Sequence, residues 1–177
     1  MKLRYVTGRG GSASEGLSKY LGTQVTDFAA LPVDATLLKL SIDEQITLVN
    51  EFCSTATHLV VNSYGAYLWL LSRIDASPSS TNVLMLSPVM GRAVDTEKMI
   101  ASRPPRMKGF ESAIAEDRVT LPDNVSVYTG RDDQVCDFKT AVSQCERLGI
   151  TDLHILESET HNLSHGVVST LVGAFIK

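Results

Sequence analysis

Short apolar runs alternate with stretches of helical periodicity along almost the whole chain, and this alternation strongly restricts the possible folds. Most of the runs are continuously apolar, which is typical of strands that are buried on both faces of a sheet. Such strands, separated by helices, indicate a mostly parallel sheet of about five or six strands. The predicted strands are residues 3–7, 23–28, 59–62, 83–86, 125–128 and 153–156.

The segments between these runs have the spacing of amphipathic helices. In residues 43–54, for example, Ile46, Val49 and Cys53 share one face, and residues 138–148 repeat the pattern. Other helices are predicted at residues 14–21, 64–70, 107–117 and 165–176. The fold class is therefore α/β, a three-layer arrangement with helices on both faces of the sheet.

The composition favours one domain spanning residues 1–177, because 177 residues that are 44% hydrophobic can build a substantial core. A net charge of −4 argues against nucleic acid as a partner. No apolar run is long enough to cross a membrane and none resembles a secretion signal, so we expect a cytoplasmic protein. Three cysteines without Cys-x-x-Cys spacing predict buried, reduced thiols.

Three residues suited to nucleophilic catalysis follow predicted strands. Ser63 stands between a buried strand and an apolar helix, Asp133 follows the strand at 125–128, and His161 follows the strand at 153–156. Side chains at the carboxyl ends of parallel strands meet at one edge of a sheet. Ser63 by itself could equally be the N-cap of the helix that follows it.

Four segments resemble those of the α/β-hydrolases. Residues 61–66 resemble the Gly-x-Ser-x-Gly nucleophile elbow, with Val61 in place of the first glycine. Residues 127–135 resemble the segment in which the triad Asp follows a Gly, here Gly130, by three positions, and residues 158–163 resemble the loop that carries the triad His. Residues 7–10 resemble the oxyanion loop His-Gly-x-Gly, with Thr7 in place of His.

This resemblance implies a minimal α/β-hydrolase that cleaves a small ester or thioester substrate without a cofactor or metal. The catalytic residues would be Ser63, Asp133 and His161, with Asp132 a solvated neighbour or helix cap. The oxyanion would be held by the backbone N–H groups of Tyr64 and Arg9. A non-catalytic binding protein that kept the fold is a further alternative.

Two other interpretations use some of the same residues. Residues 8–13 also fit a Gly-x-Gly-x-x-Ala dinucleotide fingerprint, for which Asp27 would bind the ribose. His161 and His165 have a His-x-x-x-His spacing that could bind zinc on a helix, but no third ligand accompanies them. In residues 92–108, five basic residues against Asp95 and Glu97 could attract an anionic substrate or form a solvated face: Arg92, Lys98, Arg103, Arg106 and Lys108.

Overall fold

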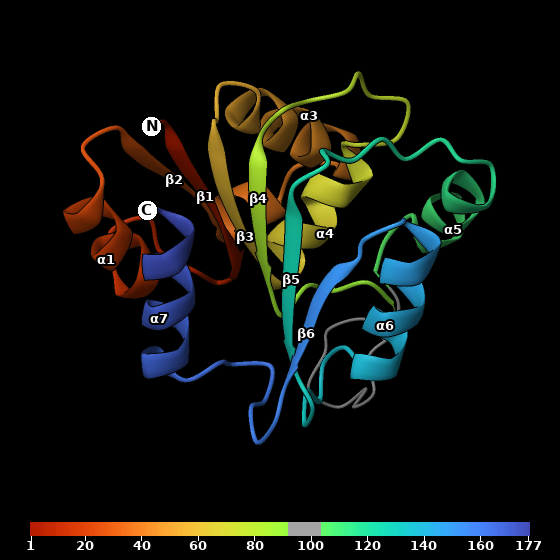
Figure 1. Ribbon diagram of the computed structural model, residues 1–177. Coiled ribbons are helices and arrows are strands. Elements are labelled where there is room, and N and C mark those ends of the chain that lie inside the picture. The colour runs from red at the N-terminus through yellow and green to blue at the C-terminus, as the bar shows by residue number, and fades with distance from the viewer. Residues whose placement is uncertain (92–103) are drawn as a thin grey trace.

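The computed structural model describes residues 1–91 and 104–177. Its described part contains one six-stranded sheet in the order β2-β1-β3-β4-β5-β6 (Figure 1). All neighbouring strands are parallel, which confirms the predicted fold class. The strands are β1 (Leu3–Arg9), β2 (Phe28–Val33), β3 (His58–Asn62), β4 (Asn82–Leu86), β5 (Val125–Gly130) and β6 (Asp152–Leu156).

Helices cover both faces of this sheet. Helices α1 and α7 lie on one face, and α3 to α6 lie on the other (Figure 1). The helix α4 is apolar on every side, and seven of its nine residues are buried between the sheet and α3. The helices are α1 (Gly16–Gln24), α2 (Ala35–Leu38), α3 (Ile42–Cys53), α4 (Ser63–Leu71), α5 (Met107–Ala115), α6 (Phe138–Arg147) and α7 (His165–Phe175).

Successive strand residues divide between two apolar clusters, because side chains in a strand alternate between its two faces. Tyr5, Val60 and Leu84 belong to the cluster under α1 and α7. Their neighbours Val6 and Val61 belong to the cluster under the helices of the opposite face. The continuous apolar runs of β1, β3 and β4 therefore reflect strands that are buried on both sides.

The strand predicted at residues 23–28 is wrong in position. Helix α1 continues to Gln24, and β2 begins only at Phe28. Leu21 and Val25, four residues apart, are both buried under the same face of the sheet. Pro32 lies within β2, which is an edge strand, where proline is tolerated because one side needs no ladder hydrogen bond.

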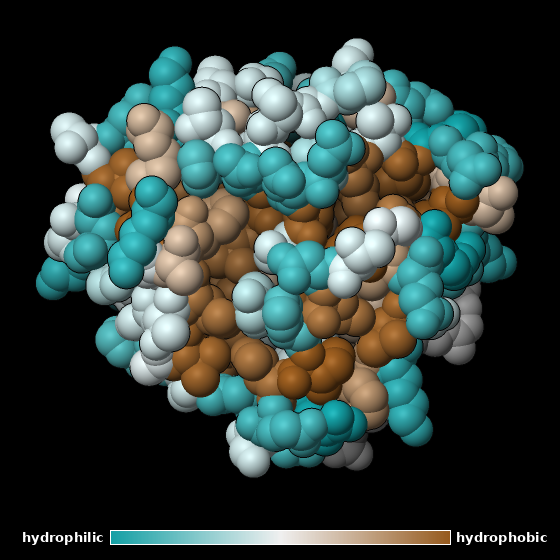
Figure 2. Space-filling model, viewed as in Figure 1, coloured by the Kyte–Doolittle hydropathy of each residue, from teal (hydrophilic) through white to brown (hydrophobic). Residues whose placement is uncertain are grey.

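On the face that carries α7, apolar side chains lie over this helix and the neighbouring strands (Figure 2). Hydrophilic side chains cover the loops at the lower edge of the same view, where the strands end. No helix in residues 1–91 or 104–177 has the length and apolar character needed to cross a membrane.

Candidate active site

Ser63, Asp133 and His161 meet at the carboxyl edge of the sheet. Ser63 follows β3 directly, Asp133 lies in the loop after β5, and His161 lies in the loop between β6 and α7. The register of the sheet brings these loops together although 98 residues separate Ser63 from His161.

Ser63 sits on a sharp turn between a strand and a helix. Its φ of 50° is in the left-handed region, which is uncommon for a residue with a side chain and marks local strain. The turn presses α4 against β1, so that a Cβ on Gly65 would lie 2.2 Å from the carbonyl oxygen of Thr7. Gly8 is also close, since a Cβ there would lie 3.1 Å from the Cβ of Ser63.

Val61, which departs from the elbow pattern, does not lie at this tight contact. It is fully buried in β3, where it pairs with Val6 and Met85 and belongs to the cluster under α4. The close contacts of the turn are made instead at Gly65, against the backbone of Thr7, and at Gly8, against the side chain of Ser63. A valine two residues before the serine is therefore compatible with the turn.

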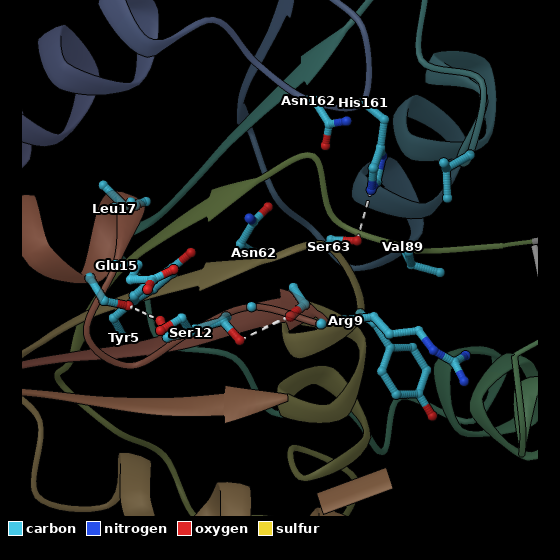
Figure 3. Close-up of a pocket in the computed structure, with 18 of the residues that line it drawn as sticks. Tyr5, Arg9, Ser12, Glu15, Leu17, Asn62, Ser63, Val89, His161 and Asn162 are labelled. Atoms are coloured by element: carbon cyan, nitrogen blue, oxygen red, sulfur yellow. Dashed lines mark hydrogen bonds between the residues drawn. The ribbon is translucent and has the colours of Figure 1, made fainter. Parts of the chain in front are cut away.

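A continuous hydrogen-bond chain links the three side chains. The Ser63 Oγ lies 2.7 Å from His161 Nε2 (Figure 3), and His161 Nδ1 lies 2.9 Å from Asp133 Oδ2. With Asp133 ionised, these partners fit an imidazole that carries its proton on Nδ1 and accepts the Ser63 hydroxyl proton at Nε2. The arrangement can remove a proton from a serine that faces the cleft.

The surroundings of Asp133 hold its carboxylate in one orientation. Its side chain is fully buried, and Oδ1 accepts hydrogen bonds from the backbone N–H groups of Val135 and Cys136 at 2.8 and 2.9 Å. The preceding Gly130 leaves no room for a side chain, because a Cβ would lie 2.2 Å from the carbonyl oxygen of Glu159. Asp132 is exposed, so the two adjacent aspartates have different environments.

His161 and His165 do not form a metal site. Both ring nitrogens of His161 are already engaged by Ser63 and Asp133. His165 is exposed at the start of α7, with its ring edge-on to Tyr20 at 6.4 Å between centroids.

The positions of the two expected oxyanion donors flank Ser63. Tyr64 lies in the first turn of α4, where backbone N–H groups have no partner within the helix, and the N-cap residue Asn62 makes no capping hydrogen bond. Arg9 ends β1 beside the cleft. The neighbouring Gly10 N–H is already bound to the carbonyl oxygen of Val33 at 2.8 Å, so Gly10 is not the better donor.

Thr7 replaces the histidine of the oxyanion loop and has a structural role here. Its buried hydroxyl accepts a hydrogen bond from the Val33 N–H at 2.8 Å and donates to the carbonyl oxygen of Gly8 at 2.9 Å. A Cβ on Gly11 would collide with the Thr7 side chain. Thr7 thus fixes the course of the loop that carries Arg9.

A cleft of about 630 Å³ opens over Ser63 and His161. Arg9 and Glu15 are its charged lining side chains among the residues that the structure describes. Burial raises the pKa of Tyr5 to about 12, against an opposing hydrogen bond from Asn62, and burial also raises the pKa of Tyr64. Both phenols are therefore uncharged at neutral pH.

The sequence analysis did not identify several polar residues of this cleft, among them Tyr5, Asn62 and Asn162. Asn62 and Asn162 are each the direct neighbour of a proposed catalytic residue. Their position next to Ser63 and His161 in the sequence could have identified these two asparagines as cleft residues.

Of the charged residues in 92–108, Arg106 pairs with Asp43 at 2.6 Å and Lys108 is exposed. The remaining five lie outside the described residues: Arg92, Asp95, Glu97, Lys98 and Arg103.

The dinucleotide interpretation does not fit the geometry. Gly8 lies within β1, and α1 begins only at Gly16, so the glycines do not form the strand-to-helix turn that would hold a pyrophosphate. Asp27 precedes β2, at the opposite edge of the sheet from this loop, and pairs with Arg4 at 2.9 Å.

The three cysteines are free and buried, as predicted. Cys136 is the cysteine nearest to the site. Burial raises the pKa of its thiol to about 11, so it remains protonated at neutral pH and is a poor nucleophile.

No family model and no curated protein matches the sequence. Solved structures do match its fold. The ydeN gene product of B. subtilis has 14% identity and a TM-score of 0.67, with 99% of each chain covered. A Xanthomonas campestris protein assigned to the hydrolases of the alpha/beta superfamily has 12% identity and a TM-score of 0.63, covering 98% of this chain and 94% of that one.

A monoacylglycerol lipase from Paleococcus ferrophilus is similar to the same extent, at 12% identity and a TM-score of 0.63, with 98% of this chain and 94% of the other covered. These similarities span nearly the whole chain. The chain has the α/β-hydrolase fold.

Proposed function

We propose that the protein is a serine hydrolase that cleaves a carboxylic ester or thioester of a small substrate. The observation that carries this proposal is the hydrogen-bond chain from Ser63 through His161 to the buried Asp133. Several neighbours in fold are named as hydrolases, and one as a monoacylglycerol lipase, which supports the same reaction class.

In the first half of the reaction, Ser63 Oγ attacks the carbonyl carbon while His161 Nε2 takes the hydroxyl proton. Asp133 holds the imidazole in the required tautomer and stabilises the imidazolium that forms. The tetrahedral intermediate then collapses, the bond to the alcohol or thiol breaks, and His161 returns its proton to that leaving group. The acyl group remains bonded to Ser63.

Two backbone N–H groups, those of Tyr64 and Arg9, stabilise the negative oxygen of each tetrahedral intermediate. Such donors act strongly because they are already oriented before the charge develops. The Tyr64 N–H also lies at the amino end of α4, where the helix dipole favours negative charge.

In the second half, a water molecule gives a proton to His161 and attacks the acyl carbon. The second intermediate collapses, Ser63 recovers the proton from His161, and the carboxylic acid leaves. No group other than the three side chains, the two N–H donors and water is required.

A fluorophosphonate probe tests the proposal directly, since its phosphorus is attacked by an activated serine hydroxyl and fluoride leaves. We expect stoichiometric labelling of the native protein, with the modified peptide mapped by mass spectrometry to Ser63. Heat-denatured protein is the control and should not react. A folded protein that stays unlabelled would favour the alternative of a binding protein that has kept only the fold.

The two adjacent aspartates should differ sharply in importance. In Asp133→Asn, the side-chain amide can donate to His161 Nδ1 and force the proton onto Nε2, which then cannot accept the Ser63 proton. We expect a loss of kcat on the order of ten-thousand-fold, measured with p-nitrophenyl butyrate. Asp132→Asn is the matched control and should retain most of its activity, because Asp132 is exposed. The reverse result would move the catalytic acid by one residue.

A further inference from the structure

A second cavity, of about 300 Å³, continues the cleft between α1 and α7. Six residues line both of them: Tyr5, Gly16, Leu17, Asn62, His161 and Asn162. Figure 3 shows Asn62 between Ser63 and Leu17, with Arg9 on the other side of Ser63. The cleft therefore leads away from Ser63 in two directions, and only one of them passes between the helices.

Beyond this shared entrance, Tyr20, His165 and Ser169 line the cavity between α1 and α7 together with apolar side chains, and apolar atoms make up the larger part of its surface. Leu86 of β4 contributes to its floor, Leu17 of α1 lines one side, and Leu163 and Val168 line the side of α7. Within the described part of the chain, its lining contains no Asp, Glu, Lys or Arg, whereas the main cleft contains Arg9 and Glu15. Such a lining favours a hydrocarbon group, which gains free energy on leaving water.

We propose that this cavity binds the acyl chain of the substrate, an inference that rests on the proposed ester hydrolysis. During deacylation the acyl group stays bonded to Ser63 while the alcohol or thiol departs. A mainly apolar cavity between two helices can therefore hold the hydrocarbon chain of this acyl group until it is hydrolysed. The other direction of the cleft, past Arg9, is then free for the leaving group to depart and for a water molecule to enter.

The size of the cavity sets the expected chain length. A volume of 300 Å³ holds roughly ten groups the size of a water molecule, at about 30 Å³ each. Because part of this volume is the entrance shared with the cleft, we expect acyl chains of up to about eight carbons. The substrate class is thus an ester or thioester of a short to medium fatty acid.

A series of p-nitrophenyl esters from acetate to dodecanoate tests this. For the native protein, kcat/KM should rise by up to about fourfold per methylene that enters the cavity, and should fall beyond about eight carbons. Val168→Phe should fill the cavity and lower the ratio of kcat/KM for octanoate to that for acetate by at least about tenfold. This is the effect expected when two or more methylenes of the chain are no longer buried. Val167→Phe is the matched control, because Val167 lines neither cavity, and its ratio should equal that of the native protein.

Leu163→Ala tests the inference in the opposite direction and keeps it testable if Val168→Phe does not fold. Circular dichroism checks the folding of both variants. Because Leu163→Ala enlarges the cavity, the acyl chain length with the highest kcat/KM should increase.

If neither folded variant changes the chain-length profile while the esters are still hydrolysed, the acyl chain lies elsewhere and only this inference is overturned. If Val168→Phe instead changes the preference among acetate esters of different alcohols, the cavity holds the alcohol and the inference is likewise overturned. If no ester is hydrolysed and Ser63 stays unlabelled, the proposed function itself fails.

Discussion

Replacing Ser63 by alanine is expected to abolish hydrolysis of p-nitrophenyl butyrate while leaving the fold intact. The substitution removes only the Oγ atom, which is the proposed nucleophile and the hydrogen-bond partner of His161 Nε2. Loss of the nucleophile in a serine hydrolase lowers kcat on the order of a million-fold. Alanine keeps the Cβ, so the left-handed backbone of the turn is no more strained than with serine. Steady-state kinetics and a thermal melt measure the two parts of this expectation.

Ser87→Ala is a suitable control for this variant. Ser87 follows the next strand, β4, and also has a positive φ, of 41°, but it is fully buried and does not line the cleft. Its Oγ has no hydrogen-bond partner among the residues that the structure describes. We expect Ser87→Ala to keep its activity. Native-like turnover by a folded Ser63→Ala protein would refute the mechanism.

Replacing His161 by alanine should be about as damaging as replacing Ser63. Without the imidazole, no base remains within hydrogen-bond distance of Ser63 Oγ among the described residues, and the buried Asp133 loses its partner. Loss of the histidine alone costs on the order of a million-fold in kcat in enzymes of this mechanism. The same variant should also fail to react with a fluorophosphonate at a measurable rate.

His165→Ala and treatment with EDTA separate this mechanism from the zinc alternative. His165 is exposed and makes no contact with the hydrogen-bond chain, so its alanine variant should keep most of the activity towards p-nitrophenyl acetate. Dialysis against EDTA should leave the activity of the native protein unchanged. Equal losses in the two histidine variants, together with inactivation by EDTA, would instead indicate a metal centre.

The sequence by itself determined the kind of elements in this protein and their order. Apolar runs predicted parallel strands, and β1, β3, β4, β5 and β6 lie where those runs stand. The runs of β1, β3 and β4 are apolar throughout because both faces of these strands are covered, whereas β6, at the end of the sheet, is only partly covered. The helix α3 follows the apolar spacing of Ile46, Val49 and Cys53 to within one residue at its ends. The positions of Ser63, Asp133 and His161 after three of the strands could also be predicted, because residues after parallel strands share one edge of the sheet.

The tertiary structure decided what depends on contacts between distant segments. Whether residues 28–33 form a strand depended on their place at the edge of the sheet, where Pro32 is tolerated. Val61 is compatible with the elbow because the close contacts of the turn are made by other residues, with Gly65 of α4 against Thr7 and Gly8 of β1 against Ser63. The cavity between α1 and α7 joins residues from both ends of the chain, such as Leu17 and Val168. Local periodicity carries no information about such pairs, because they meet only when the sheet has formed and both helices have packed on the same face.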